Sequence, residues 1–268
     1  MESVDSGKRR AQTAPLMMTR RKFLRDLALL SLGMGLAPRE GRSFGRSSLF
    51  TPAIARHGGD WDARLPALRT LCWELSQRTS IRVFPEPKPA ALDSKELFAS
   101  PFLYFGGTRA FPALSEVSIQ NLRRFLDMGG FLLADAGDGS NGQGFDASMS
   151  REFRRLFPDR ELVRLPAEHV IFKSYYLLDR QAGRVNTRPF LTAVLEGGGQ
   201  ARAVYSQNDL LGAFQRDDLG EWAFEVLPGG RTQRELALRV AVNLAMYSLC
   251  LDYKSDLLHL PFLMKRRR

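Results

Sequence analysis

The residues most suggestive of chemistry are two aspartates beside a glycine-rich loop. Asp135 directly follows the apolar run 131–134, and Asp138 lies within the stretch 137–144, where every second or third residue is glycine. Carboxylates at such a position can bind a metal ion or act as a general base. They can equally accept hydrogen bonds from the backbone amides of a turn. The sequence leaves both interpretations open for Asp135 and for Asp138.

The apolar run before Asp135 is one of several predicted strands that alternate with predicted helices. Strands are expected at residues 50–56, 81–84, 102–105, 131–134, 162–165, 191–196 and 201–205, and helices at 63–78, 115–128, 148–157 and 232–249. Residues 86–90, which contain two prolines, are expected to form an extended connection. This alternation predicts βαβ units and a mostly parallel sheet that is covered by helices on both faces.

Ligands of open α/β sheets bind at the carboxyl ends of the strands, where neighbouring parallel strands end at one edge. Glycines and polar side chains follow several of the predicted strands, so we expect them to gather along that edge. The candidate ligand-binding residues are His57, Gly59, Asp60, Gly106, Gly107, Asp135, Asp138, His169 and Asn208. Each also has a structural interpretation, such as a turn-forming aspartate, a hydrogen-bonded loop histidine or a glycine that permits close backbone approach.

Missing motifs exclude several specific chemistries. The sequence contains no phosphate-binding G-x-x-x-x-G-K-[ST] loop, and neither an H-E-x-x-H nor a paired C-x-x-C zinc motif. Its two cysteines, Cys72 and Cys250, lie on apolar helical stretches and are expected to be buried thiols. A divalent metal held by mixed carboxylate and imidazole ligands stays open as a cofactor.

Residues 19–37, TRRKFLRDLALLSLGMGLA, have the pattern of a twin-arginine signal peptide. A pair of arginines precedes an apolar run from Leu27 to Ala37, which is shorter than the roughly 20 residues that a membrane span needs. The expected partner is therefore the twin-arginine (Tat) translocation machinery, and the expected location is the periplasm or cell envelope. An amphipathic first helix of the domain is the alternative interpretation. Because no clear cleavage site follows, an uncleaved form anchored in the membrane also stays open.

We expect a signal peptide and linker over residues 1–45 and a single α/β domain with a basic C-terminal tail over residues 46–268. The net charge of +10 is concentrated at the ends, because residues 1–40 carry +4 and the last four residues, Lys265–Arg268, carry another +4. The middle of the chain is left with +2, well short of the basic surface typical of a nucleic-acid-binding domain. We therefore expect no nucleic acid among its partners.

Seven segments resemble, in the same order, the bacterial family called domain of unknown function 4159. They are RHGGDW (56–61), ELFASPFLYFGGTRAF (96–111), LRRFLDMGGFLLADAGDG (122–139), REFRRLFPDREL (151–162), EHVIFKSYY (168–176), AVYSQNDL (203–210) and NLAMYSLCLDYKSDLLHLPFLMKRRR (243–268). The resemblance implies a three-layer, flavodoxin-type fold like that of class I glutamine amidotransferases. It also implies an exported or membrane-associated setting, often near MoxR-type ATPases and von Willebrand-type proteins, and it supplies no established activity.

The resemblance also bears on Asp135. In amidotransferase-like folds, the turn after the strand that follows the glycine pair carries the nucleophilic cysteine. Here that turn reads Ala134-Asp135-Ala136-Gly137, so glutaminase activity is not expected.

Three functions stay open. The favoured one is a cell-envelope domain without catalytic activity that binds a ligand or a protein at the strand-end residues, among partners linked to MoxR-type ATPase systems. The alternative is a metal- or carboxylate-dependent hydrolase or sugar-active enzyme that uses Asp135, Asp138, His57 and His169. The third is contact with a membrane surface through the basic tail.

Deleting Lys265–Arg268 should weaken binding of the full chain to anionic liposomes at low salt, because each basic residue near such a surface contributes roughly 1 kcal/mol. Co-sedimentation with liposomes at two salt concentrations measures this effect. Unchanged binding after the deletion would exclude the membrane-surface role of the tail.

Overall fold

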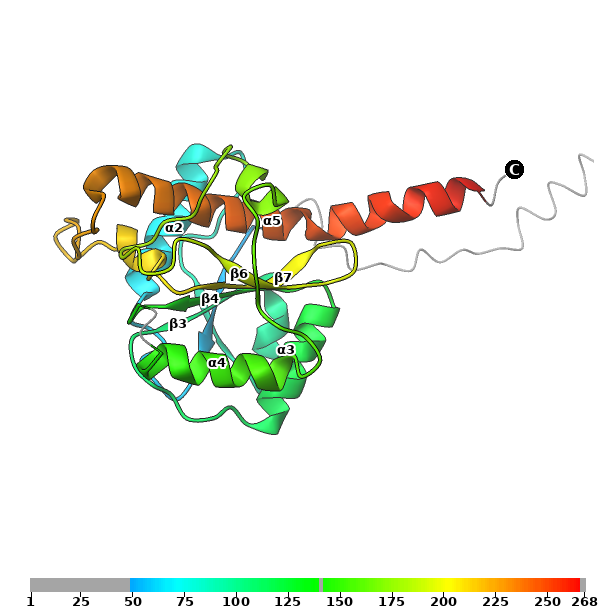
Figure 1. Cartoon of the computed structure of the whole chain (residues 1–268), viewed down its shortest axis with the longest axis horizontal. Coiled ribbons are helices and arrows are strands. Elements are labelled where there is room, and N and C mark those ends of the chain that lie inside the picture. Colours follow the sequence, from blue (N-terminus) through cyan, green and yellow to red (C-terminus); the bar gives the residue numbers. More distant parts are fainter. Residues whose placement is uncertain (1–48, 140–141, 266–268) are drawn as a thin grey trace, which may run out of the picture. The chain divides into compact units, whose positions relative to one another are not determined.

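The computed structural model describes residues 49–139 and 142–265 and contains a seven-stranded sheet (Figure 1). Its strand order is β2-β1-β3-β4-β7-β6-β5. The strands are β1 (Ala53–Arg56), β2 (Lys88–Ala91), β3 (Phe102–Gly107), β4 (Phe131–Ala136), β5 (Val163–Arg164), β6 (Thr192–Leu195) and β7 (Ala201–Ser206). The first five strands in this order pair in parallel, whereas β6 is antiparallel to β7 and β5 is antiparallel to β6.

Helices cover both faces of the sheet. In Figure 1, α2 and α5 lie on one face, and α3 and α4 lie on the other. Their bounds are α2 Leu65–Arg78, α3 Glu116–Asp127, α4 Gly144–Leu156 and α5 Gly230–Lys265, and short 3₁₀ helices η1, η2 and η3 span Lys95–Ala99, Val170–Lys173 and Leu211–Phe214. The chain therefore has the predicted three-layer α/β fold with a mostly parallel sheet.

The central strand β4 shows why the sheet needs helices on both faces. Every residue of its sequence FLLADA is buried. Phe131 and Leu133 pack in the core beneath α2 and α5, and Leu132 and Ala134 pack in the core beneath α3 and α4. A strand that is apolar on both sides gains from burial only when both faces are covered.

Local signals set the ends of the helices on the second face. Ser115 caps α3 as predicted, because its side chain accepts a hydrogen bond from the amide of Ser118. The helix ends before Gly129, whose φ of 96° suits a glycine. The next helix, α4, begins at Gly144, earlier than predicted, because the distant carboxylate of Asp138 accepts from an amide in its first turn.

One strand prediction was wrong, and another was too long. Residues 81–84 contribute only one isolated bridge, between Val83 and Phe50, and the edge strand is instead β2, in the proline-containing segment predicted as a connection. An edge strand tolerates Pro89 because one row of its backbone groups pairs with no neighbour. The strand predicted at 162–165 shrinks to the two exposed residues of β5 at the opposite edge.

The predicted signal peptide and linker, residues 1–45, lie outside the described residues, and so do the last three residues of the basic tail. Within the described part of the chain, no helix combines the length and apolar character that crossing a bilayer requires.

Replacing Leu71 with alanine should lower the free energy of unfolding by about 2–5 kcal/mol, because this α2 side chain is fully buried in the core beneath α2 and α5. Urea denaturation of the full chain measures the change. The control is Leu177→Ala, since Leu177 is 85% exposed and its loss should change stability by no more than about 0.5 kcal/mol. Equal effects of the two variants would contradict this core.

Candidate functional site

The carboxyl ends of the parallel strands bring most of the candidate residues together. Gly106 pairs with Asp135 across β3 and β4, and Asp135 pairs with Ser206 across β4 and β7. His57, Gly59 and Asp60 follow β1, Asp138 follows β4, and Asn208 follows β7, all at this same edge. We call this edge, defined by His57, Gly59, Asp60, Gly106, Gly107, Asp135, Asp138 and Asn208, the carboxyl edge.

His169 does not lie at the carboxyl edge. Its Nε2 atom is 3.0 Å from the carbonyl oxygen of Gly199, in the turn that precedes β7, and its ring lies 5.9 Å from the ring of Tyr247. That turn is at the amino end of β7, so the chain folds back across the sheet after β5. The expectation that His57 and His169 share one edge was wrong.

Asp135 is fully buried and holds together the segment that follows β7. Its carboxylate oxygens accept hydrogen bonds from the amides of Leu210 and Leu211 at 2.8 and 2.9 Å, and Oδ2 also accepts from the hydroxyl of Tyr104 at 3.2 Å. Burial, and then the nearby negative charge of Asp209, raises the pKa of Asp135 to about 6. The carboxylate therefore serves as a structural acceptor inside the domain.

The contact between Tyr104 and Asp135 depends on Gly106. The tyrosine ring lies along β3 and passes over the glycine, so a Cβ atom at position 106 would be 2.2 Å from the tyrosine hydroxyl. Gly106 is therefore explained by close packing against a side chain of its own strand.

His57 is 9% exposed and is held in the core beneath α3 and α4. Its Nδ1 atom accepts from the amide of Gly59 at 3.0 Å, which places the ring proton on Nε2, and Nε2 donates to the carbonyl oxygen of Gly106 at 3.0 Å. The ring also stacks on Phe105 with a centroid distance of 4.8 Å. Burial lowers the pKa of His57, which favours this neutral form.

Asp60 joins the loop after β1 to the loop after β3. Its carboxylate accepts from the amides of Thr108 and Arg109 at 3.0 to 3.1 Å and from the Thr108 hydroxyl. Gly107 leaves room for this contact, because a Cβ atom there would lie 3.0 Å from the Asp60 carboxylate and 2.9 Å from the ring of Phe145.

Carboxylates also bind backbone amides at the C-terminal end of the glycine-rich stretch. Oδ2 of Asp138 accepts from the amide of Phe145 at 2.8 Å, and a Cβ atom on Gly144 would approach that oxygen to 2.5 Å. Buried Asp146 accepts from the amide of Gly142 at 3.1 Å and from the hydroxyl of Tyr205 at 2.6 Å. Asp138 therefore helps to start α4 through Oδ2, while its buried Oδ1 atom has no hydrogen-bond partner among the described residues.

Asn208 completes the edge by pairing with a neighbouring segment in the manner of a strand. It is fully buried, its Oδ1 atom accepts from the amide of Arg188 at 2.8 Å, and its Nδ2 atom donates to the carbonyl oxygen of the same residue.

A buried ion pair beneath this edge was not among the candidates. Arg64 binds the carboxylate of Asp209 through Nε and Nη2, both at 2.7 Å, and the two side chains are 5% and 0% exposed. Arg184 donates to the same carboxylate, and Nη2 of Arg64 also donates to the carbonyl oxygen of Gly137 at 3.3 Å. The ion pair therefore joins the start of α2 to the loops after β4 and β7.

The chemistry available at the carboxyl edge is consequently limited. Its carboxylates accept from backbone or buried donors. Within residues 49–139 and 142–251, no set of three histidine, cysteine or acidic side chains gathers in a way that could hold a metal ion. The edge is a hydrogen-bonded framework that fixes the loops.

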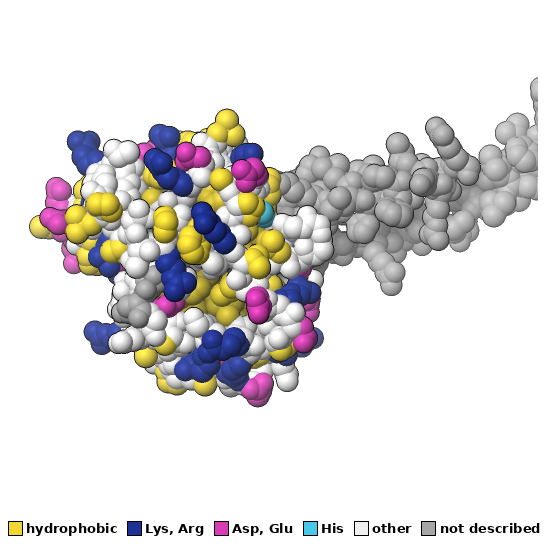
Figure 2. Space-filling view, in the orientation of Figure 1, with side chains coloured by type: hydrophobic (Ala, Val, Ile, Leu, Met, Phe, Trp, Pro, Cys, Tyr) yellow, Lys and Arg dark blue, Asp and Glu magenta, His cyan; other side chains and the backbone are white. Residues whose placement is uncertain are grey.

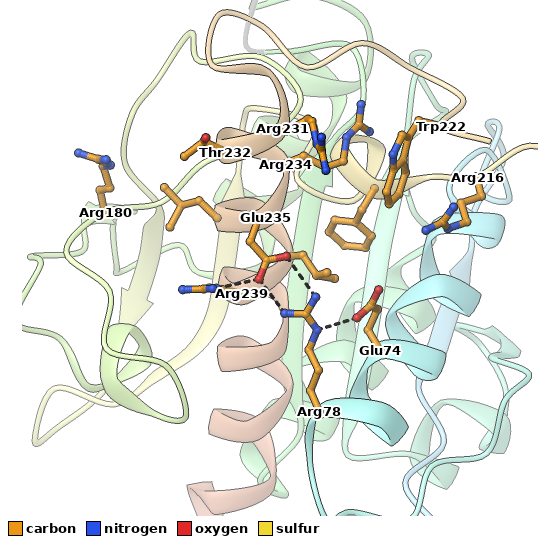
Figure 3. Close-up of a pocket in the computed structure, with 13 residues that line it drawn as sticks. Glu74, Arg78, Arg180, Arg216, Trp222, Arg231, Thr232, Arg234, Glu235 and Arg239 are labelled. Carbon is orange, nitrogen blue, oxygen red and sulfur yellow. Dashed lines mark hydrogen bonds and ion pairs between the residues drawn. The ribbon is translucent and has the colours of Figure 1, made fainter. Parts of the chain in front are cut away.

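A second candidate site is a pocket that is accessible from the surface of the domain. A pocket of about 670 Å³ lies between α2, the start of α5 and the loop after η3, and Figure 3 shows its lining. We call it the arginine pocket. The charged and aromatic residues that line it are Glu74, Arg78, Arg180, Phe214, Arg216, Trp222, Arg231, Arg234, Glu235 and Arg239. Six arginines face two glutamates, so its lining carries excess positive charge.

One end of the arginine pocket is neutralised by ion pairs. Glu235 accepts from Arg78 at 2.8 and 3.1 Å and from Arg239 at 2.8 Å, and Glu74 accepts from Arg78 at 2.6 Å (Figure 3). The hydrogen bond from Arg78 is the main cause of a lowered pKa of Glu235. We call these four residues the ion-pair end.

The other end, which we call the indole end, consists of Arg216, Trp222, Arg231 and Arg234. The guanidinium carbons of Arg216 and Arg234 lie 3.9 and 4.4 Å from the centre of the Trp222 ring, and Figure 3 shows the indole between them. Burial, followed by the positive charge of Arg216, lowers the pKa of Arg234. Among the described carboxylates, none forms an ion pair with the three arginines of this end.

The family profile described as a domain of unknown function, DUF4159, matches residues 51–249. The chain belongs to this family. A comparison with curated proteins gives no match. The resemblance found in the sequence is therefore confirmed for the family, and the match spans the carboxyl edge and the arginine pocket of this DUF4159 domain.

Sequence reasoning passed over the arginine pocket, although one signal was available. Residues 231, 234, 235, 238 and 239 recur at the spacing of one helical face, and four of the five are charged. The signal was weak because the apolar residues of α5 predicted a largely buried helix. The loop that brings Arg216 and Trp222 of the DUF4159 domain to this face has no regular pattern.

Replacing Asp135 with asparagine should destabilise the DUF4159 domain by about 1–3 kcal/mol, because the new amide NH₂ faces a backbone N–H donor. Folding raises the pKa of this carboxyl from 3.8 to about 6, so the native state holds the proton more tightly than the unfolded chain. The contribution of Asp135 to stability thus falls as pH rises from about 4 through about 6. The stability difference between wild type and Asp135→Asn should shrink over that interval.

Urea denaturation of the full chain between pH 4 and pH 7 measures this difference. Exposed Asp218 provides the control, because Asp218→Asn should leave both stability and its pH profile close to wild type. A difference between wild type and Asp135→Asn that stays constant with pH would contradict the buried carboxyl described above.

Proposed function

We propose that this chain is an exported, non-catalytic binding domain of the cell envelope whose ligand site is the arginine pocket, and that its ligand is anionic. The observation that carries the proposal is the contrast between the carboxyl edge and the arginine pocket. Most polar groups of the carboxyl edge, Oδ1 of Asp138 excepted, form hydrogen bonds within the protein, whereas Arg216, Arg231 and Arg234 have no carboxylate partner among the described residues.

Uncompensated guanidinium groups in a concave site attract anions. Arginine presents a planar fork of N–H donors that matches the oxygens of a carboxylate or phosphate, and it keeps its charge at any physiological pH. Low-dielectric walls strengthen that attraction. In this pocket the walls include Phe214, Leu236 and Leu238, so charge and apolar surface lie side by side.

The hydrolase or sugar-active alternative receives less support from the geometry. An acid–base residue must reach its substrate within hydrogen-bond distance. Asp135 and Asn208 are fully buried, His57 is almost so, and His169 lies at the other end of the sheet. The absence of a cysteine at the position of Asp135 also argues against glutaminase activity, if the domain shares the class I amidotransferase-like fold that the family resemblance implies.

The cellular setting in this proposal comes from the sequence. Export by the Tat machinery follows from the twin-arginine segment, and envelope partners linked to MoxR-type ATPases follow from the family resemblance. A nucleic-acid partner is disfavoured because Figure 2 shows basic side chains scattered among acidic and hydrophobic ones on the face in view, without a continuous basic stripe.

Binding of two multivalent anions, pyrophosphate and citrate, tests the proposal. Isothermal titration at low salt should detect binding to the full chain, and the double variant Arg216→Gln/Arg231→Gln should weaken it at least about tenfold, because each arginine supplies a charge-assisted hydrogen bond.

The matched control is Arg124→Gln/Arg154→Gln, which removes the same charge from exposed positions on α3 and α4. This control should bind both anions as the wild type does. Equal losses in the two double variants would show that binding follows net charge alone. If the wild-type chain bound neither anion, the pocket would not be an anion site.

A further inference from the structure

We infer that the anionic group held at the indole end is a phosphoryl group of the phosphomonoester type. This inference rests on the proposed function and specifies the chemical class of its ligand. It depends on three features: the positive charge of the pocket that no glutamate balances, the contacts that hold the guanidinium groups, and the hydrogen-bond donors around them.

The positive charge that the glutamates of the pocket leave unbalanced is larger than one carboxylate could neutralise. At the ion-pair end, two glutamates already bind Arg78 and Arg239. At the indole end, three guanidinium groups remain without a carboxylate from the described residues. A phosphomonoester brings a charge of about −1.5 to −2 at neutral pH and three acceptor oxygens, whereas a carboxylate brings one charge and two oxygens.

Two of the three guanidinium groups at this end, those of Arg216 and Arg234, are held in place by the protein itself. Arg234 donates to the carbonyl oxygens of Ala213 and Phe224, the latter at 2.9 Å, and its Nε atom has no hydrogen-bond partner among the described residues. Arg216 donates to the carbonyl oxygen of Gly220 and stacks on Trp222. Positively charged side chains that are fixed close together favour a multiply charged anion over a single charge.

The stacked arginines also indicate that the Trp222 ring does not bind the ligand by stacking. Because Arg216 and Arg234 both lie over the Trp222 ring, they compete with a sugar or base for its faces. Stacking itself does not use the N–H donors of a guanidinium, and the donors that Arg216 and Arg234 do not spend on backbone carbonyls stay available for oxygen acceptors. Trp222, which is 40% exposed, therefore acts as a spacer that aligns two arginines rather than as a platform for the ligand.

The first turn of α5 adds further donors beside these arginines. Arg231 and Thr232 are exposed and line the pocket, and Arg231 lies next to Arg234 in Figure 3. The start of a helix also carries partial positive charge, which adds to the attraction for an anion. The pocket volume of about 670 Å³ leaves room for an organic group attached to the phosphate, against Phe214 and Leu236.

Three ligands with the same organic group test the inference on the full chain: phenyl phosphate, phenyl sulfate and benzoate. We expect phenyl phosphate to bind at least about tenfold more tightly than the other two at pH 7.5. Its affinity should rise as the pH passes through about 6, where the phosphate loses its second proton, while that of phenyl sulfate should not. Glu235 should not contribute to this rise, because its lowered pKa keeps it ionised throughout.

Variants of the exposed residue Arg231 test whether phenyl phosphate binds at the indole end. Arg231→Gln should weaken phenyl phosphate about tenfold, and Arg231→Lys should restore part of the loss, because lysine keeps the charge without the fork. Arg124→Gln on α3 is the control and should bind as the wild type does.

Vesicles distinguish a lipid source of the phosphoryl group from a soluble one. Phosphatidylcholine vesicles are compared with vesicles that also contain phosphatidic acid. Recruitment to the latter that Arg231→Gln abolishes assigns the group to a lipid headgroup, and binding of phenyl phosphate without such recruitment assigns it to a soluble phosphomonoester.

The outcomes separate the two proposals. Benzoate or phenyl sulfate binding as tightly as phenyl phosphate would overturn the phosphoryl assignment and leave the anion pocket standing. Failure of all three to bind would overturn the phosphoryl assignment, and it would overturn both proposals only if pyrophosphate and citrate also failed to bind. Binding of phenyl phosphate that Arg231→Gln leaves unchanged would overturn both.

Discussion

The ion pair between Arg64 and Asp209 is the interaction on which the rest of the structure depends. Both side chains are almost completely buried, and a charge in that position is tolerated only when it is fully paired. Removing either partner would leave the other charge uncompensated. The pair also constrains the backbone, since Asp209 has a φ of 52° and Gly212 has no Cβ that would collide with its carboxylate.

Several distant segments meet at this ion pair. Arg64 reaches the carbonyl oxygen of Gly137 in the loop after β4, and Asp209 accepts from the amide of Gly212 at the start of η3. The guanidinium groups of Arg64 and Arg184 both lie over the ring of Phe224, at 4.9 and 5.5 Å. Because the backbone oxygen of Phe224 accepts from Arg234, the buried ion pair also helps to place the indole end of the arginine pocket.

Under the proposed function, this arrangement separates the residues that stabilise the fold from those that bind a ligand. At the carboxyl edge, where α/β folds commonly bind ligands, this chain uses its polar side chains to fix loops. Excess positive charge lies instead on the layer formed by α2 and α5, where only part of it is neutralised by glutamates. This distribution supports the proposed binding role, because Asp135, His57 and Asn208 are buried whereas the charged groups of the arginine pocket are accessible.

The sequence by itself determined the three layers, most of the helices and strands, the family and the group of residues at the carboxyl edge. These features follow from local rules: alternating apolar runs, the cap at Ser115 and the glycines at 129 and 130. Tertiary structure decided what those residues do. Asp135 became a buried acceptor because the segment after β7 turns its amides toward β4, and His169 left the edge because the chain after β5 folds back to the turn before β7. The arginine pocket likewise unites residues 74 to 239, which meet only after α2, α5 and an irregular loop have packed, so the charged face of α5 alone could not reveal it.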